Sequence, residues 1–341
     1  MSPKFKNPRA RFNFQGRTCS ITGVGSYVPA KILTNAHLEK MVDTSDEWIV
    51  TRTGIKARRQ AAKDEFTSDM AAHAAQRAMK KAGVTADQID LIIVATITPD
   101  MPFPATACIV QQKIGAGRAA AFDLEAACSG FIYGLEVGQQ FIMSRTYDTV
   151  LVIGAEKLSS IVDWTDRNTC VLFGDGAGAA VLQSRPNSHG LLTAVMGADG
   201  SKGNLIHMPG GGSRCPASAA SVDARLHFLR MEGKETFKNA VQAMLTAARE
   251  ALRRCELDIT KIKCVIPHQA NQRIIDAVGE RLGATPEQLF INLDRYGNTS
   301  AASVAIALDE AVSSGRIQRG DLILLIVFGA GLTWGAAVIE W

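Results

Sequence analysis

The sequence contains no C-x-x-C pair, no long unbroken apolar segment and little excess charge. Its seven cysteines are scattered along the chain, which argues against a zinc site or a thioredoxin-like motif and is typical of reduced thiols in a cytoplasmic protein. The apolar run LILLIVFGAGL near the C-terminus is broken by glycines and too short to span a bilayer. A net charge of +4 is too small to indicate nucleic-acid binding. We therefore expect no metal, membrane or nucleic acid as a partner.

The N-terminal stretch lacks the apolar core of a secretory signal. Residues 1–16, MSPKFKNPRARFNFQG, are basic and polar, and we interpret them as a flexible leader. The whole chain is long for one small domain, because 341 residues of which 47% are hydrophobic can bury a large core. Two closely joined domains, or one duplicated domain, are the expected solutions.

Short apolar segments alternate with helical patterns along the chain, which predicts an α/β fold. Residues 90–99, DLIIVATITP, form a continuous apolar run typical of a fully buried strand, and residues 149–156, TVLVIGAE, form another. Before these strands, small and apolar residues recur at helical spacing in residues 67–83, where Gly83 is the expected end of a helix.

The second half of the sequence repeats the first. Residues 84–97 resemble residues 257–270, and residues 111–130 resemble residues 279–300, with matching turns and apolar strands. A repeat at half the chain length indicates two similar α/β halves, and the polar segment QSRPNSHG is the expected join. We predict an N-terminal half over 17–186 and a C-terminal half over 187–341. Functional groups are expected at the strand ends where the halves meet.

Cys128 is the first candidate for a reactive group. In FDLEAACSGF an apolar strand ends, the chain turns, and the cysteine comes at the expected N-terminus of a helix. Unpaired N–H groups there favour negative charge, so we expect the pKa of the thiol to be lowered and the side chain to act as a nucleophile. The alternative is a cysteine packed in the core.

His268 and Asn298 are the second and third candidates. His268 follows an apolar strand and a proline, and Asn271 could orient it or cap the following helix, although a purely structural histidine is an equal alternative. Asn298 lies in DRYGNTSAAS before an alanine-rich helix, where it could also be a helix cap. The internal repeat places Asn298 near the counterpart of Cys128, so pseudo-two-fold symmetry would bring all three to one crevice. A cysteine, a histidine and an asparagine in one pocket suit acyl-thioester chemistry.

Three motifs connect these candidates to a known family. ACSGF around Cys128, PHQANQRI around His268 and YGNTSAAS around Asn298 closely resemble β-ketoacyl-ACP synthase III, a family of thiolase-fold condensing enzymes. DTSDEWIVTRTGI, DWTDRNT, FGDGAGAAV and FGAGLTWGAAVIEW are similar as well, so the resemblance extends over residues 17–341. It implies a thiolase-like α/β fold in which two pseudo-symmetric halves form five layers, αβαβα.

The resemblance also implies a reaction. Cys128 would take the acyl group of an acyl-CoA primer, expected to be acetyl-CoA, and His268 and Asn298 would donate hydrogen bonds to the thioester carbonyl of malonyl-ACP. Backbone N–H groups of Cys128 and of the glycine turn after Phe328 would hold the oxyanion. The products would be acetoacetyl-ACP, carbon dioxide and CoA, at the start of type II fatty acid biosynthesis. The implied enzyme is a cytoplasmic homodimer that binds acyl carrier protein, with acyl-CoA as substrate and no prosthetic group.

Binding residues follow from the same resemblance. Trp48, Arg52 and Arg167 would hold the adenine and phosphate end of CoA. Phe328 would shield the acyl site, and Phe103 would enter the acyl pocket of a partner subunit. The further positions that the resemblance assigns are Phe328 and Asn271 to CoA, and Gln269, Ala270, Asn271, Gln272, Arg273 and Lys238 to the carrier protein. The two cations of this carrier set could equally be ordinary solvated surface residues.

Other functions are possible from the sequence alone. GDGAGAAV resembles a nucleotide-binding loop, but the residues after it have the pattern of a strand and not of the required helix. A thiolase would need a second catalytic cysteine near the C-terminus, and no cysteine follows Cys264. A starter enzyme of secondary metabolism would share the same three residues, whereas a catalytically silent carrier-binding protein would not need them. The primer, acetyl, propionyl or branched, is left open, and Ala330 stands where many relatives have a third glycine.

Overall fold

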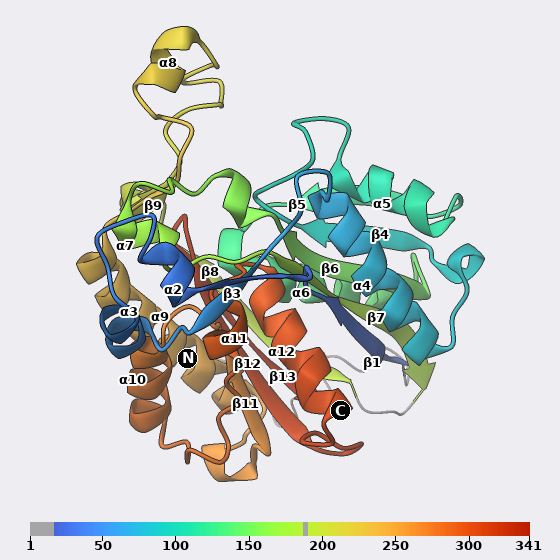
Figure 1. Cartoon of the computed structure of the whole chain (residues 1–341). Helices are drawn as coiled ribbons and strands as arrows, with labels where there is room; N and C mark the ends of the chain where they lie inside the picture. Colours follow the sequence, from blue (N-terminus) through green and yellow to red (C-terminus); the bar gives the residue numbers. More distant parts are fainter. Residues whose placement is uncertain (1–16, 187–189) are drawn as a thin grey trace.

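The computed structural model describes residues 17–186 and 190–341, whose longer strands form two sheets (Figure 1). Strands of the first sheet come from residues 17–186, and those of the second from residues 191–340. The predicted division after residue 186 coincides with this change of sheet, but it borders on residues outside the described ranges and stays a prediction. The predicted leader, residues 1–16, also lies outside these ranges.

The first sheet has the strand order β1-β7-β6-β4-β5. β4 runs parallel to β5 and β6, whereas β7 runs antiparallel to β6 and β1. β4 and β6 are buried at every residue, which explains why β4 is apolar throughout and β6 is apolar between Thr149 and Glu156. The strand bounds are β1 Arg17–Tyr27, β4 Leu91–Ala95, β5 Ala120–Leu124, β6 Thr149–Glu156 and β7 Gly176–Pro186.

The second sheet has the strand order β11-β12-β13-β8. β11 runs parallel to β12, and β13 runs antiparallel to β12 and β8, which repeats the pairing of β4, β6, β7 and β1 in the first sheet. The bounds are β8 Leu191–Ala198, β11 Cys264–Pro267, β12 Leu322–Gly329 and β13 Thr333–Glu340. The resemblance of residues 279–300 to residues 111–130 predicted a strand corresponding to β5, but only an isolated bridge joins Val265 and Leu289. The segment leaves the sheet because the next amides, of Asn292 and Leu293, donate to the side chain of Gln269.

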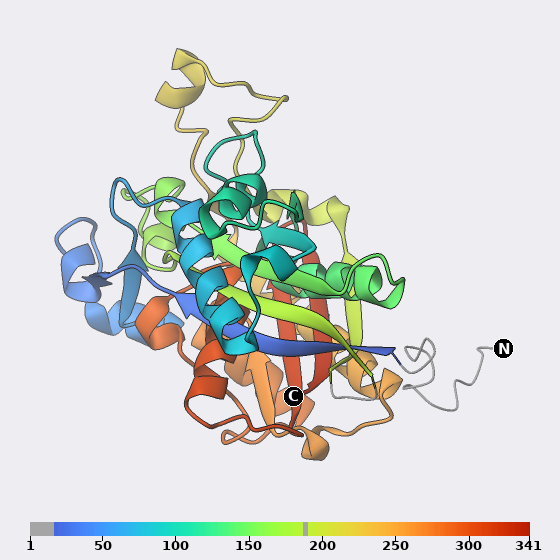
Figure 2. The same ribbon diagram turned by 90° about the vertical axis from the view of Figure 1, so that its right-hand side faces the viewer.

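Helices cover both sheets and separate them, so the order of layers is α-β-α-β-α (Figures 1 and 2). α4 and α5 lie on the outer face of the first sheet, α6 and α12 lie between the sheets, and α9 and α10 lie on the outer face of the second. Their bounds are α4 Thr67–Ala82, α5 Thr106–Ile114, α6 Gly130–Met143, α9 Gly233–Arg254, α10 Gln272–Leu282 and α12 Ala302–Ser313. α4 ends at Gly83 as predicted, with φ of 68°. Within the described ranges, no helix combines the length and the apolar character that a membrane crossing requires.

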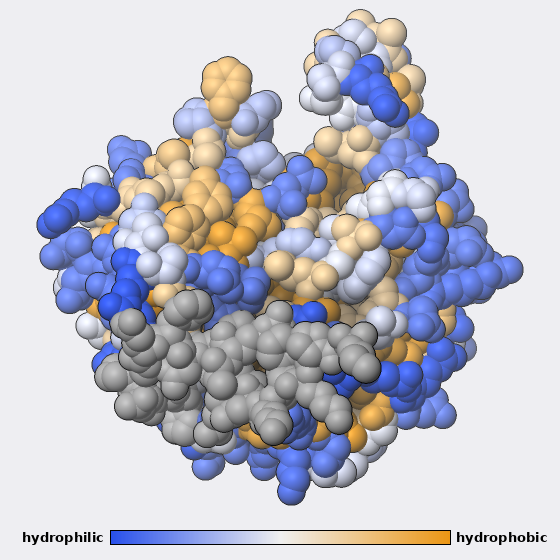
Figure 3. Space-filling view, turned by 180° about the vertical axis from the view of Figure 1, so that it is seen from behind, coloured by the Kyte–Doolittle hydropathy of each residue, from blue (hydrophilic) through white to orange (hydrophobic). Residues whose placement is uncertain are grey.

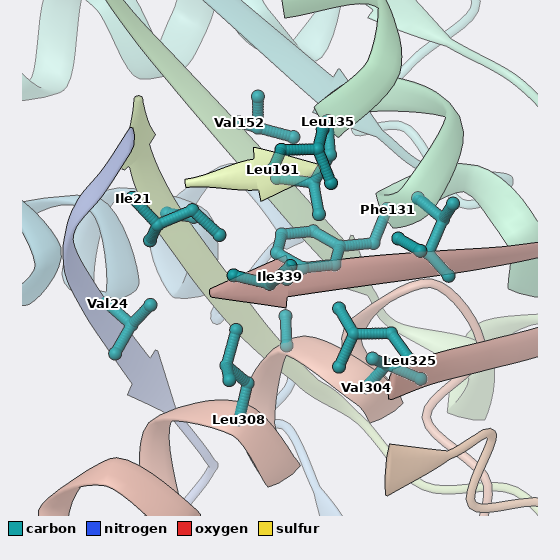
Figure 4. Packing of buried hydrophobic residues seen from close by; sticks show 14 of the residues in the cluster. Ile21, Val24, Phe131, Leu135, Val152, Leu191, Val304, Leu308, Leu325 and Ile339 are labelled. Carbon is teal, nitrogen blue, oxygen red and sulfur yellow. The ribbon is translucent and has the colours of Figure 1, made fainter. Parts of the chain in front are cut away.

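The central layer is the shared core of both halves (Figure 4). Alternate residues of β12 point in opposite directions: Leu325 packs against the central helices, and Leu324 packs against the outer helix α9. Phe131 of α6 and Val304 of α12 belong to the same buried cluster. Since two sheets close on these two helices, the N-termini of α6 and α12 are held in fixed positions between the halves.

Smaller elements surround one end of these layers. They are β2 Lys31–Thr34, α2 Asn35–Leu38, α3 Asp46–Thr53, β3 Ala57–Gln60, α7 Arg167–Cys170, β9 Ile206–His207, α8 Ala219–Asp223, β10 Arg230–Met231 and α11 Leu293–Tyr296. The segment that carries α8 projects from the body of the molecule (Figures 1 and 2).

Candidate active site

A cavity of about 150 Å³ lies where the two halves meet. Cys128 from the first half and His268 and Asn298 from the second all line it, so the convergence predicted from the repeat is present in the structure. Its walls are mostly apolar, with Phe328 at the end of β12 and Ile97 beyond the end of β4 among them. Such a site excludes water around a few polar groups.

Cys128 is positioned by a tight turn between β5 and α6. The turn is a short 3₁₀ helix, Ala127–Ser129, and Ala127 has the left-handed φ of 46°. A Cβ on Gly329 would lie 2.7 Å from the backbone nitrogen of Cys128, so only glycine lets the end of β12 approach this turn so closely. The backbone of the glycine turn and the N–H of Cys128 are thus side by side, as an oxyanion site requires.

The pKa of the Cys128 thiol differs from the sequence prediction. Burial raises it to about 12, and the Glu156 carboxylate adds to the rise, whereas a lowered value was expected at a helix N-terminus. The expectation was wrong because the cavity is apolar and a nearby charge is negative. The thiol is therefore the resting form at neutral pH, and its proton must be removed during any attack on a thioester.

His268 is held at the end of β11 with only 4% of its surface exposed. Its backbone N–H donates to the carbonyl of Ile326 at 2.7 Å, and its Nδ1 is 2.6 Å from the Ser303 hydroxyl. Burial lowers the pKa of the imidazole to about 4, so it is neutral at physiological pH. With Nδ1 occupied by Ser303, Nε2 is the nitrogen left for a ligand in the cavity.

Asn298 is fixed by its own turn and not by helix capping. Its Oδ1 accepts from the N–H of Ser300 at 2.8 Å, and its backbone N–H donates to Leu172 at 2.8 Å. α12 begins later, with Ala301 as its cap and no side-chain capping bond. Because the amide oxygen is engaged, the Asn298 side chain presents Nδ2 as a hydrogen-bond donor.

The predicted CoA residues lie together at the surface. The guanidinium carbons of Arg52 and Arg167 are 4.8 and 5.0 Å from the centre of the Trp48 ring. Two cations on one indole form a site suited to an aromatic base that carries phosphates. Asn271 caps α10 through the N–H of Arg273 and donates to the carbonyl of Arg52 at 3.1 Å. Of its two predicted roles beside His268, the structure therefore supports the cap.

One predicted carrier-protein contact is wrong. Gln269 is 1% exposed and uses its side chain internally, accepting from Asn292 N–H and donating to the carbonyls of Pro267 and Phe290. A side chain enclosed in this way cannot touch a partner protein. The remaining members of the predicted set, Ala270, Asn271, Gln272, Arg273 and Lys238, are partly or fully exposed.

The two cations of this set lie on neighbouring helices. Arg273 of α10 has its guanidinium 5.7 Å from the ring of Phe237, the residue before Lys238 on α9. Lys238 pairs with Glu235 at 2.8 Å. An exposed ion pair of this kind is weak and leaves the lysine able to exchange partners.

Phe103 lies in the loop before α5 with 83% of its surface exposed, and it does not line the cavity of its own chain. Met101 in the same loop and Val222 in the segment around α8 are also exposed. Seen from behind, the molecule has two segments that project at the top of the view, and apolar side chains appear on the surface below them (Figure 3). A large exposed aromatic on a soluble surface suggests a partner.

The nucleotide-binding alternative loses support. GDGAG leads directly into strand β7, so the helix that a nucleotide-binding loop requires does not follow it. Among the described residues, no group of three or more histidine, cysteine, aspartate or glutamate side chains could hold a metal ion.

Sequence reasoning missed three polar residues of the site: Ser303, Ser300 and Glu156. Ser303 and Ser300 stand in the YGNTSAAS motif, but their partners become visible only in three dimensions. Glu156 could have been recognised from the sequence, because a carboxylate at the end of an expected buried strand is unusual.

Comparisons with known proteins identify relatives of this chain over most of its length. A family model of 3-oxoacyl-[acyl-carrier-protein] synthase III matches residues 122–200, and a model of its C-terminal part matches residues 252–341. A β-ketoacyl-[acyl-carrier-protein] synthase III of Caldanaerobacter subterraneus is 59% identical over 94% of this chain and 97% of the relative. The crystal structure of the synthase III of Aquifex aeolicus has a TM-score of 0.88 and 49% identity, covering 95% of this chain and all of that one.

A polyketide enzyme is also similar, at a lower level. The priming β-ketosynthase of the R1128 polyketide pathway has a TM-score of 0.87 and 37% identity, over 95% of this chain and 96% of that one. The structural matches confirm the predicted thiolase-like α/β fold. The extent and level of identity lead to one conclusion: this chain belongs to the β-ketoacyl-ACP synthase III family.

Proposed function

We propose that this β-ketoacyl-ACP synthase III transfers an acyl group from acyl-CoA to Cys128 and condenses it with malonyl-ACP. The enzyme is an acyltransferase of fatty acid biosynthesis. The observation that carries the residue assignment is the meeting of Cys128, His268 and Asn298, from two halves, in one cavity beside the glycine turn. A cytoplasmic location stays a prediction.

In the first half-reaction the Cys128 sulfur attacks the thioester carbon of acyl-CoA. The carbonyl oxygen becomes negative as the new bond forms, and we expect the N–H of Cys128 and a backbone N–H of the glycine turn after Phe328 to stabilise it, since Gly329 brings this turn close to Cys128. CoA leaves as the thiol once it has received the proton that Cys128 loses. The acyl group then lies in the apolar cavity beside Phe328.

In the second half-reaction malonyl-ACP loses carbon dioxide, and the electrons of the broken bond move onto the thioester carbonyl as an enolate. Neutral His268, through Nε2, and Asn298, through Nδ2, donate hydrogen bonds to this oxygen. Two fixed donors suffice because decarboxylation needs stabilised charge and no base. The enolate carbon attacks the acyl-cysteine, and the Cys128 sulfur leaves as a thiolate that takes up a proton from solvent.

Acylation of the cysteine is the step to test first. We expect intact-mass spectrometry to show a gain of one acyl group after incubation with acetyl-CoA, and no gain in Cys128→Ala. Longer and branched acyl-CoAs in the same assay would rank the primers. Acylation of Cys128→Ala, or none of the wild-type protein by any primer, would contradict the proposed role of this residue.

A starter role in polyketide synthesis is the second candidate, since the R1128 priming enzyme is similar over 95% of this chain. The 59% identity to a bacterial synthase III favours fatty acid synthesis. The primer assay separates the two roles, because efficient acylation by acetyl-CoA followed by acetoacetyl-ACP formation is expected only for the first.

The homodimer is proposed from the exposed Phe103. Burying an aromatic ring of this size stabilises an interface substantially, and a charge at the same position opposes burial. We expect the wild-type protein to sediment as a dimer and Phe103→Asp to shift toward monomer, whereas Phe103→Leu keeps the dimer. A monomeric wild-type protein in analytical ultracentrifugation would refute this proposal.

A further inference from the structure

Thr333 lies where the two halves of the active site join, and neither half-reaction above uses it. It begins β13, directly after the glycine turn that follows Phe328. Its hydroxyl donates to the carbonyl of Ala126 at 2.9 Å and to the carbonyl of Ala330 at 3.0 Å. Ala126 starts the turn that carries Cys128, and Ala330 belongs to the glycine turn. One side chain therefore connects the turn of the nucleophile to the turn of the other half.

The two carbonyls that share this hydroxyl belong to rigid backbone units. The Ala126 carbonyl also accepts from the N–H of Ser129 at 3.0 Å, which closes the 3₁₀ turn around Cys128. Because a peptide unit is planar, fixing the Ala330 carbonyl also fixes the N–H of Gly331 in the same plane. The Thr333 bonds thus hold backbone groups of both turns in a set orientation.

The glycine turn is joined to its own sheet by other bonds. The N–H of Leu332 donates to the carbonyl of Asp199 at 2.9 Å, and the N–H of Asp199 donates to the carbonyl of Leu332 at 2.8 Å. Within the described ranges, no hydrogen bond besides those of Thr333 joins residues 126–130 to residues 329–333. Loss of the hydroxyl would therefore release the two turns from each other while the glycine turn stays bound to the second sheet.

The spacing of the two turns is close and leaves little room for error. A Cβ on Gly329 would lie 2.7 Å from the nitrogen of Cys128 and 3.1 Å from the Thr333 hydroxyl oxygen. Cys128, Gly329 and Ala330 line the cavity, whereas Thr333 is not among its lining residues and supports them from behind. Donors stabilise an oxyanion only at hydrogen-bond distance, so a displacement of about 1 Å would remove much of their effect.

We propose that Thr333 is a positioning residue for acyl transfer: its hydroxyl keeps the Cys128 turn and the glycine turn at the spacing at which both can bind one carbonyl oxygen. The inference rests on the proposed function, in which Cys128 accepts the acyl group. Attack on acyl-CoA and attack on the acyl-cysteine both place negative charge on this oxygen. Decarboxylation places it on the oxygen held by His268 and Asn298, so that step should not depend on Thr333.

The test compares two reactions of the same sulfur in the full-length protein. Acetyl transfer from saturating acetyl-CoA forms an oxyanion, whereas alkylation of Cys128 by iodoacetamide displaces iodide from a saturated carbon and forms none. We expect Thr333→Val to slow acetyl transfer about 10-fold, less than loss of a whole oxyanion donor would, and to leave alkylation unchanged. Quenched mass spectrometry of the Cys128 peptide measures both rates, so the other cysteines do not interfere.

Two variants serve as matched controls. Thr333→Ser keeps the hydroxyl and should restore most of the acetyl-transfer rate. Thr193→Val makes the same change of hydroxyl to methyl in β8, where the buried Thr193 hydroxyl has no partner among the described residues, and should match the wild type. Valine suits a strand, and Thr333→Ala removes the hydroxyl without new bulk if the valine variant does not fold.

A role in general stability predicts a different pattern. An equal fall in acetyl transfer and alkylation, or wild-type acetyl transfer without the hydroxyl, would overturn the positioning role, as would a serine variant no faster than the valine variant. Release of carbon dioxide from malonyl-ACP should stay at the wild-type rate in Thr333→Val, and a parallel loss there would also contradict the proposal. These outcomes leave the proposed function intact, whereas acyl transfer to Cys128→Ala would overturn the role of the cysteine itself.

Discussion

At the scale of single residues, the chemistry depends on how each polar atom is oriented. The Ser303 hydroxyl accepts from Gln269 N–H at 3.5 Å, so its hydrogen is available to Nδ1 of His268 at 2.6 Å. That bond places the imidazole proton on Nε2, where the proposed mechanism needs a donor. Ser303 is thus a positioning residue for His268.

Replacing this hydroxyl should weaken one half-reaction. We expect Ser303→Ala to lower the rate of malonyl-ACP decarboxylation about 10-fold, as loss of one hydrogen bond would, and Ser303→Thr to restore it. Release of carbon dioxide from malonyl-ACP measures the effect, and acylation by acetyl-CoA serves as the comparison. Equal losses in both half-reactions, or no rescue by threonine, would point to a structural role only.

His268 should also make folding sensitive to acid. The unfolded chain binds the histidine proton below its ordinary pKa of 6.5, and the folded protein does so only near its pKa of about 4. Acid therefore favours the unfolded chain, and stability is lost as the pH falls between these values. Relative to His268→Gln, the wild type should lose about 3 kcal/mol of unfolding free energy over this range. Urea denaturation of both proteins at about pH 7 and pH 4 tests this, and a constant difference would contradict it.

Sequence alone predicted which residues would meet, but not their protonation. The motifs around Cys128, His268 and Asn298 are local, and the internal repeat indicated that they converge. The pKa of the thiol depends on burial and on Glu156, which is far away in sequence, and a helix-terminus argument could not include either. Gln269 was misassigned for a similar reason, because its enclosure by residues 290–293 is a tertiary feature.

At the scale of elements, the predicted strands and helices are largely present because their burial patterns are simple. The exception is the expected fifth strand of the second sheet. The N–H groups of Asn292 and Leu293 donate to the Gln269 side chain instead of to a neighbouring strand, and the periodicity of the sequence does not reveal this. The position of whole elements depends on small residues. Gly154 lets β6 touch the turn that carries Asn298 and precedes α12.

Gly154→Ala should separate these two elements. The new Cβ would lie 2.3 Å from the carbonyl oxygen of Ala301, so the backbone must shift, and we expect a loss of about 2 kcal/mol or more in unfolding free energy together with a lower kcat. Gly117→Ala is the matched control, since its Cβ would meet open space. Chemical denaturation and condensation assays measure both effects. A Gly154→Ala protein with the stability of the control would show that the contact can relax.

At the scale of the whole molecule, His268 and Asn298, two of the proposed catalytic residues, are buried, so a large partner protein cannot contact them directly. The cavity, of about 150 Å³, is far too small for a protein, so a carrier protein would dock outside it and deliver the malonyl group. The net charge of +4 is modest, but Arg273 and Lys238 place positive charge on the adjoining surfaces of α9 and α10. An acidic carrier surface would be steered there by charge, with a strong dependence on salt.

Reversing that charge should impair docking more than chemistry. We expect Arg273→Glu to raise the KM for malonyl-ACP about 10-fold and to flatten its salt dependence, because rim charges act mainly on association. The KM for acetyl-CoA should change far less, since Arg273 lies outside the Trp48 cluster. Arg118→Glu, an equally exposed reversal between α5 and β5, is the control for net charge. Equal rises in both variants would mean that total charge, and not this surface, guides the carrier to the cavity.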